Sequence, residues 1–222
     1  MNAERQGGFS LIELLVSLAI LSIVIGVVLD GINTMQARNT VETNKLDLTQ
    51  QTREFMDQII NDLDQAGFPS LSMFDPVGLT SASDCTQDNN VACGFKYLST
   101  SEIQFEGDVD GSGVSYVDIK LNPPGGPCPC TIQRGAIAKP GTTPLFYTQV
   151  DNVMNTAVFT AYDSGGNNLD LTAPITGAGG FDNITAIGIT LYVKSSQPDP
   201  KTGQYPTVTM VSTAKVNNIQ SY

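Results

Sequence analysis

Histidine and tryptophan are both absent from the 222 residues of this chain. The lack of histidine excludes Ser-His and Cys-His catalysis and removes the commonest transition-metal ligand. No other side chain stands out as a nucleophile beside a base, so we expect neither an enzyme nor a cofactor. Basic residues are also scarce: 11 Lys and Arg stand against 22 Asp and Glu, a formal net charge of -11. Phosphate repels so acidic a chain, so nucleic acid is not an expected partner.

Proline is absent before Pro69, so nothing in the preceding segment forces a helix to break. We therefore predict one long helix over residues 9–66. Its first part, Phe9 to Leu29, is a run of 21 apolar residues broken by a single acid. As a helix this run spans roughly 30 Å, about one hydrocarbon core. The sequence thus predicts a transmembrane half at residues 9–30 and a second half at residues 31–66 outside the membrane.

A polar octapeptide, Met1 to Gly8, precedes this run, and the single acid within it is Glu13. A secretory signal peptide has a shorter apolar core and carries its small residues after that core. A plain uncleaved anchor leaves Glu13 and the Gly7-Gly8-Phe9 junction unexplained, because a carboxylate at a transmembrane helix centre costs about 2.5–3.5 kcal/mol. The helix dipole favours an anion in the first turn, but it does not remove this desolvation cost.

The junction, the acid and the apolar run together resemble the processing site of type IV prepilins. The resemblance implies that residues 1–8 are a leader peptide, that cleavage occurs after Gly8, and that the new terminus, Phe9, is N-methylated. It also implies that Glu13 acts in assembly, where it meets the positive N-terminal amine of an adjacent subunit. Such an attraction is strong in a medium of low dielectric, and it would set the axial register of an incoming subunit.

Only four cysteines are present, Cys85, Cys93, Cys128 and Cys130, and all follow the apolar run. Their spacings fit paired zinc knuckles poorly. We expect two disulfides, which implies an oxidising compartment such as the bacterial periplasm. Three pairings are possible. Pairing Cys128 with Cys130 across Pro129 would close a small, strained ring, so we slightly favour the pairings that join the two segments.

Beyond residue 31 the predicted helix carries one apolar stripe, which we expect to pack on a sheet. The stripe consists of Val41, Leu48, Phe55, Ile59 and Leu63, and a mostly solvated face lies between them: Glu42, Asp47, Arg53, Glu54, Asp57, Asp62 and Asp64. Gly67-Phe68-Pro69 ends the helix, since Gly suits a C-terminal cap and Pro cannot continue it. Residues 67–94 are predicted to form a connecting loop.

In residues 95–222 the apolar period changes to two, which predicts half-buried antiparallel strands between turn-forming segments. The expected strands cover residues 102–106, 117–121, 131–134, 158–162, 187–194 and 207–216. The expected fold class is therefore α+β and pilin-like: a long N-terminal helix, transmembrane in its first half, packed on an antiparallel β-sheet domain.

Residues 51–68 resemble the helix end of PilW/PulJ-type minor pilins. Residues 105–113 resemble their first hairpin, and residues 189–193 and 198–203 their last two strands and the turn between them. This resemblance implies a minor pilin, a structural subunit that primes or caps assembly of a type IV pilus. The alternatives are a minor pseudopilin of a type II secretion system and a pilus-tip adhesion module.

The expected partners are other pilin or minor pilin subunits, the prepilin peptidase/methyltransferase, the inner-membrane assembly platform and membrane lipid. The expected location is the bacterial inner membrane, in a single pass with the C-terminal domain in the periplasm. From there the subunit would move to the tip of a pilus or pseudopilus filament.

Asp108 and Asp110 precede Gly111 in a pattern similar to the start of an EF-hand calcium loop. With Glu106 at loop position one, position twelve is Val117, so the bidentate carboxylate of that motif is missing. A hairpin turn that uses Asp and Gly for its backbone angles explains the same residues. Asp108 and Asp110 are therefore weak calcium candidates, and no other metal site is expected.

Overall fold

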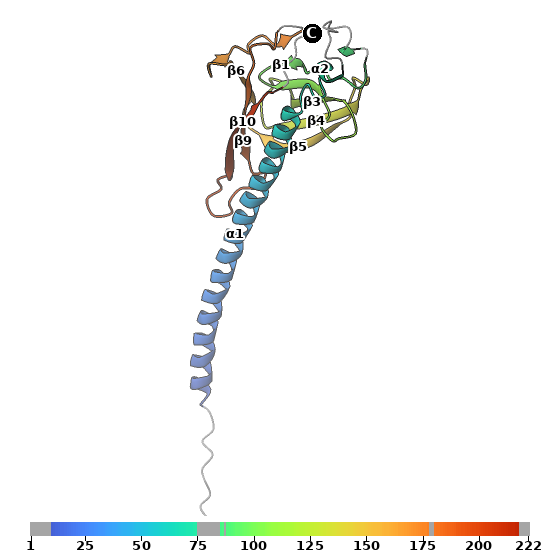
Figure 1. Cartoon of the computed structure of the whole chain (residues 1–222). Helices are drawn as coiled ribbons and strands as arrows, with labels where there is room; N and C mark the ends of the chain where they lie inside the picture. The colour runs from blue at the N-terminus through green and yellow to red at the C-terminus, as the bar shows by residue number, and fades with distance from the viewer. Residues whose placement is uncertain (1–9, 75–84, 87, 178–179, 218–222) are drawn as a thin grey trace, which may run out of the picture.

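The computed structural model describes residues 10–74, 85–86, 88–177 and 180–217. It contains one long N-terminal helix, α1, whose C-terminal part packs on a large antiparallel β-sheet (Figure 1). The N-terminal part of α1 extends away from the sheet domain as a bare stalk. The expected α+β, pilin-like architecture is confirmed.

Helix α1 spans Leu11–Asp64, 54 residues without interruption. It begins after Ser10, whose ψ of 140° is extended. Shortly after its end, Gly67 adopts a φ of +76°, a left-handed conformation that glycine takes at little cost. The predicted helix end at residue 66 is thus confirmed to within two residues. Phe9, the predicted first residue, lies outside the described residues.

The predicted apolar stripe of α1 does pack on the sheet. Leu48, Phe55, Ile59 and Leu63 have exposed fractions of 8% or less, whereas Val41 is half-buried. Burial of each such side chain contributes about 1.5–3 kcal/mol. The predicted solvated face is wrong at one position, because Asp62 is only 4% exposed.

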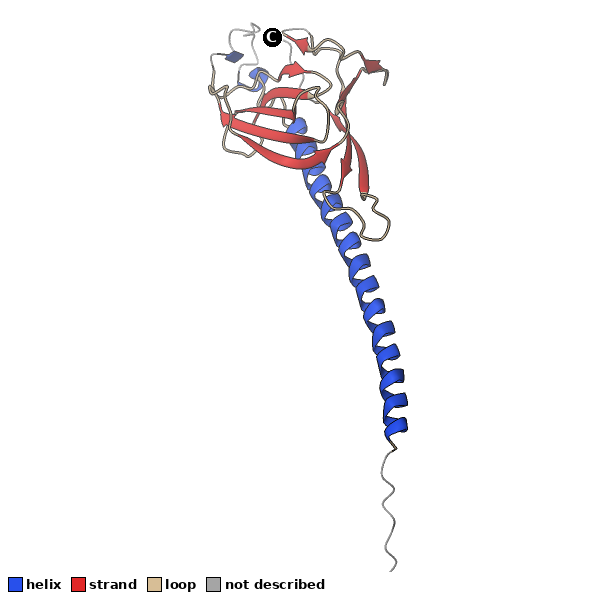
Figure 2. Ribbon diagram, turned by 180° about the vertical axis from the view of Figure 1, so that it is seen from behind, coloured by secondary structure: helices blue, strands red, loops and turns tan. Residues whose placement is uncertain are grey.

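In the described part of the chain, ten strands form the sheet, in the order β7-β6-β9-β5-β4-β3-β2-β1-β8, with β10 paired to β9 outside this path. They are β1 (Phe95–Leu98), β2 (Glu102–Gly107), β3 (Ser115–Asn122), β4 (Cys130–Ala138), β5 (Phe146–Val153), β6 (Phe159–Tyr162), β7 (Asn168–Leu169), β8 (Ile175–Thr176), β9 (Ala186–Lys194) and β10 (Thr207–Lys215). Strands β1 to β5 form a meander, and β9 then inserts between β5 and β6. Figure 2 shows the end of α1 lying against these strands.

All six predicted strands are present, in β2, β3, β4, β6, β9 and β10. The sequence did not predict β1, β5, β7, β8 or the short helix α2 (Leu71–Phe74) within the expected loop. Strand β1 has its buried residues at both ends, and β5 shows no regular alternation. The β4–β5 pairing also shifts register twice, so the period of two on which the prediction depended is lost in β5.

Candidate functional site

The N-terminal part of α1 presents an apolar surface that no other described residue of the chain covers. Leu11 is 77% exposed, Ile23 is 69% exposed, and the most apolar 18-residue stretch of the helix has no buried residue. By length and composition this helix is able to cross a membrane. Ser17 and Ser22 donate their hydroxyls to the carbonyls of Glu13 and Leu18, at 2.7 and 2.8 Å, so these polar groups are already satisfied within the helix.

Glu13 lies in the first turn of α1. The Ser10 backbone N–H donates to Glu13 Oε2 at 3.1 Å, so the carboxylate accepts a bond from one of the open amides at the helix N-terminus. The other carboxylate oxygen, Oε1, has no partner among the described residues. Glu13 therefore accepts a hydrogen bond at the N-terminal end of α1 and keeps Oε1 available for another donor. Gly8 and Phe9, the predicted processing residues, lie outside the described residues.

A buried ionic cluster joins the sheet to the segment after α1. Glu106 forms ion pairs with Lys96 and with Lys139, the latter at 2.9 Å, and accepts a bond from the Cys93 N–H at 3.0 Å. Lys139 also donates to the carbonyls of Val91, at 2.7 Å, and Cys85. Burial opposes ionisation of Glu106, yet these donors outweigh it and hold its pKa below the ordinary value.

A second ion pair fixes the end of α1 to the sheet. The Nε of Arg134, on β4, lies 2.6 Å from Oδ2 of Asp62. Burial raises the pKa of the Asp62 carboxyl, although the hydrogen bond and the charge of Arg134 lower it. Sequence reasoning missed both ionic contacts because the partners lie far apart in the chain, and no periodic pattern marks a charged residue as buried.

Two disulfides are present, Cys85–Cys93 and Cys128–Cys130, with Cα–Cα distances of 5.4 and 4.5 Å. The preference for bridges that join the two segments was wrong. Cys85 and Cys93 belong to a small hydrophobic cluster with Leu71 and Val91, whereas Cys128 and Cys130 pack in the main core. Each segment is held in a different part of the molecule, so the nearest sulfur for each cysteine is the one in its own segment.

The carboxylates of the Asp108–Gly113 turn bond to the turn itself. Asp110 Oδ1 accepts from the Ser112 N–H and hydroxyl, at 2.9 and 2.6 Å, and Asp108 Oδ1 accepts from the Gly113 N–H at 3.1 Å. The bonds from Ser112 hold the pKa of Asp110 below its ordinary value. Across the described part of the chain, no group of three or more His, Cys, Asp or Glu residues is placed to hold a metal ion.

Asp118, on β3, is a carboxylate that is only 5% exposed, which is unusual for a charged side chain. Its Oδ2 accepts from Gln104 Nε2 at 3.3 Å, while its buried Oδ1 has no hydrogen-bond partner. Burial and the nearby negative charge of Glu102 raise the pKa of Asp118 to about 6.

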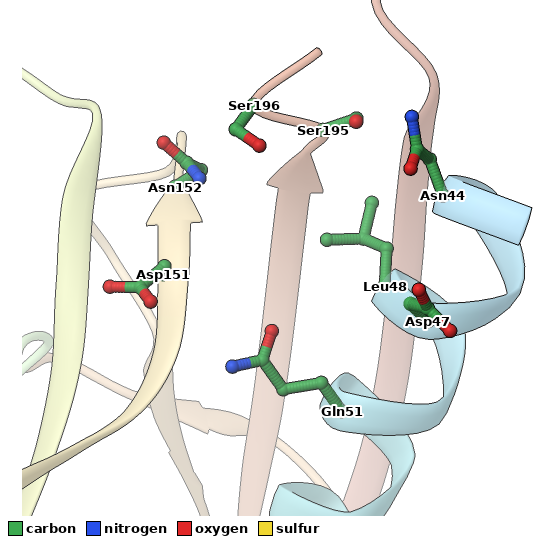
Figure 3. A pocket seen from close by; sticks show the side chains of 8 residues that line it. All are labelled: Asn44, Asp47, Leu48, Gln51, Asp151, Asn152, Ser195 and Ser196. Carbon is green, nitrogen blue, oxygen red and sulfur yellow. The ribbon is translucent and has the colours of Figure 1, made fainter. Parts of the chain in front are cut away.

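A polar cleft of about 380 Å³ opens where α1 meets the ends of β5 and β9 (Figure 3). Its lining residues are Asn44, Asp47, Leu48, Gln51, Asp151, Asn152, Ser195 and Ser196. Gln51 Nε2 donates to the Gln149 carbonyl at 3.2 Å and so ties the helix to β5 inside the cleft. Leu48 closes the main core at this point, and the remaining lining is polar.

Comparison with known proteins matches residues 4–29 to the prokaryotic N-terminal methylation motif. No curated protein and no solved structure matches the chain. The matched residues contain Gly8, Phe9 and Glu13 and most of the exposed apolar part of α1. Taken with the long helix on its antiparallel sheet, the motif supports a type IV pilin-like protein: a membrane-anchored pilin or pseudopilin subunit, processed by a prepilin peptidase and assembled with other pilins.

Proposed function

We propose that this chain is a minor pilin that primes or caps a type IV pilus from the bacterial inner membrane. The observation that carries the proposal is the uncovered apolar half of α1, with Glu13 in its first turn and within the matched methylation motif. An apolar surface of this length is stable in lipid or against other helices of its kind. The resemblance of residues 51–68 to PilW/PulJ-type proteins supports the minor role.

Glu13 gives the anchor two alternative environments. In the membrane, its carboxylate lies near the interface and accepts the Ser10 N–H. On docking into a filament, it gains the N-terminal ammonium of a neighbouring subunit, and in a low-dielectric surrounding this pair is favoured strongly. The incoming subunit is thereby aligned in the axial direction, since only one register places the carboxylate beside the amine.

Glu13→Gln tests this role, with Glu42→Gln as the matched control on the exposed part of the same helix. The expected result is that Glu13→Gln accumulates in the membrane with an intact domain but is depleted at least tenfold from sheared filaments. Glu42→Gln should be incorporated normally. Equal incorporation of all three proteins would remove Glu13 from the mechanism.

The same samples test processing and orientation. Intact-mass analysis should show loss of residues 1–8 and one methyl group on Phe9. Protease added to spheroplasts should digest the C-terminal domain, because its disulfides require the periplasm. Protection of that domain in intact spheroplasts would contradict the proposed orientation.

A minor pseudopilin of a type II secretion system shares this processing and this fold. Deletion of the chain separates the two functions, since loss of surface pili with normal protein secretion supports the pilus subunit and the reverse supports the pseudopilin. A pilus-tip adhesion module is the remaining alternative. Its test is surface binding by piliated cells with and without this subunit.

A further inference from the structure

Strand β10 lies at an open edge of the sheet. It pairs with β9 over nine consecutive residues with no register shift, and with no other strand among the described residues. The β9–β10 hairpin lies beside α1 and runs in the general direction of its axis (Figure 1). Ala214 and Val216 pack in the main core, and Val208 and Met210 lie against it, so the helix covers a face of β10 and not its edge.

The outward backbone groups of β10 follow from its ladder with β9. The Val216 N–H donates to the Thr185 carbonyl at 2.9 Å, and the Ser195 N–H donates to the Pro206 carbonyl at 2.7 Å. In an antiparallel ladder, hydrogen-bonded pairs alternate with pairs that point away. The even-numbered residues of β10 therefore bond to β9. The groups that point outward belong to Thr207, Thr209, Val211, Thr213 and Lys215.

These outward groups are free and their strand is well suited to pairing. None of them has a hydrogen-bond partner in the described part of the chain, and all five side chains are exposed, Val211 at 69%. The strand contains no Pro, no Gly and no charge before Lys215. Proteins usually protect a long, regular edge with charges, bulges or very short strands. The edge strands β7 and β8, at the two ends of the strand order, follow that rule, because they have two residues each.

We propose that the edge of β10 pairs with an edge strand of a second, different pilin-like subunit anchored in the same membrane. This inference rests on the proposed function, since it names a partner for the pilin subunit. The partner's strand completes the ladder through its backbone, and Thr209, Val211 and Thr213 then lie beside its side chains.

A second copy of this chain cannot pair with the edge in an antiparallel ladder. Two β10 edges joined in an antiparallel ladder are related by a two-fold axis perpendicular to the sheet. Because β10 runs alongside α1, that axis points the two anchor helices in opposite directions, and they cannot enter one bilayer in the same orientation. The other two edge strands of the described sheet, β7 and β8, have two residues each and are too short to pair with the nine residues of β10.

Charge favours the approach of another acidic subunit at this edge. The chain has a formal net charge of -11, yet β9 and β10 together carry Lys194 and Lys215 and no acid. The two strands are thus positive on an acidic molecule, so their own residues do not repel an acidic partner.

The test is a photo-crosslinking probe, p-benzoylphenylalanine, at Thr213 of the full-length chain in cells that make the filaments. The expected product joins this chain to a different protein that carries its own N-terminal methylation motif, identified by mass spectrometry. Val211→Pro removes one outward N–H without touching the bonds to β9, and should reduce the adduct at least tenfold. Val211→Thr keeps that N–H and should leave the adduct unchanged. Val211→Glu is the second blocking variant, because a charge on an edge opposes pairing and an acid here also repels an acidic partner.

A probe at Leu145 is the positional control and should give no such adduct, because this residue is 75% exposed and directly precedes β5, a strand that does not pair with β10. Two outcomes overturn the inference: an adduct made only of two copies of this chain, or an adduct that survives both blocking variants at their normal membrane levels. If the chain enters filaments and Thr213 gives no adduct, the pairing fails while the proposed function stands. If the variants abolish the adduct and the chain is absent from filaments, the pairing stands and the proposed function fails.

Discussion

At the scale of single residues, Asp118 is the clearest source of pH dependence. Its pKa of about 6 lies above the ordinary 3.8, because of burial first and the charge of Glu102 second. The folded chain therefore binds a proton more tightly than the unfolded chain, and the free energy of unfolding falls as the pH rises through this range. Above pH 6 the folded state holds a buried carboxylate with one unpartnered oxygen.

Asp118→Asn should therefore stabilise the protein at pH 7.5, by about 1–3 kcal/mol. The advantage should shrink as the pH falls and disappear below about pH 3, where the wild-type carboxyl is protonated in both states. Urea unfolding in detergent solution at a series of pH values measures this, with the exposed Asp57→Asn as control. If the free energy of unfolding of the wild type relative to that of Asp118→Asn is the same at pH 4 and at pH 7.5, the raised pKa of Asp118 is contradicted.

Lys139 is a buried cation that several hydrogen-bond acceptors surround, so its charge stabilises the fold, whereas that of Asp118 destabilises it. Lys139 and Glu106 have exposed side-chain fractions of 4% and 3%. Lys139→Met should lower the free energy of unfolding by about 3–5 kcal/mol, because it removes a counter-charge from a buried carboxylate. Lys201→Met, at an exposed loop position, should change it little.

A second substitution separates charge from packing. In the Lys139→Met background, Glu106→Gln should recover part of the lost stability, because it removes the uncompensated negative charge. Denaturant midpoints of the two single variants and the double variant measure this coupling. No recovery would mean that the contacts of Lys139 to the Val91 and Cys85 carbonyls carry the effect.

At the scale of elements, the contact between the end of α1 and the end of β2 leaves no space for a side chain. Ala66 and Gly107 form an isolated antiparallel bridge, and a Cβ on Gly107 would overlap the Gln65 carbonyl oxygen. Gly107→Ala should therefore destabilise the domain by about 1–3 kcal/mol. Gly31→Ala is the control, since a Cβ at Gly31 meets nothing within 4 Å. It should be neutral or stabilising by up to about 1 kcal/mol. Thermal unfolding compares the two.

The helix and six strands were predictable because each repeats a simple pattern along the chain. The stripe from Leu48 to Leu63 keeps a helical period, and β9 and β10 keep a period of two over nine residues each. Strand β5 has no such period, because its partner β4 shifts register against it. The free edge of β10 and the pairing of Lys139 with Glu106 depend on which strands become neighbours, and local pattern holds no information about that.

At the scale of the whole molecule, the two disulfides lie in separate hydrophobic clusters. We expect peptide mapping without reduction to find each bridge within one segment: Cys85 with Cys93, and Cys128 with Cys130. Thiol labelling under denaturing, non-reducing conditions should give no adduct at these four residues. A peptide that links residue 85 or 93 to residue 128 or 130 would refute this pairing.

The uncovered N-terminal part of α1 also sets the distance between the membrane and the sheet domain. If residues 11–29 occupy the bilayer, the helix from residue 30 to residue 47 separates the lipid surface from Leu48, the first buried core residue of α1. At 1.5 Å per residue, that separation is about 27 Å. The Debye length at physiological ionic strength is about 8 Å, so the surface potential of anionic lipid has decayed almost completely at the level of Leu48. The core of the acidic domain can therefore meet a neighbour with little electrostatic repulsion from the lipid beneath it.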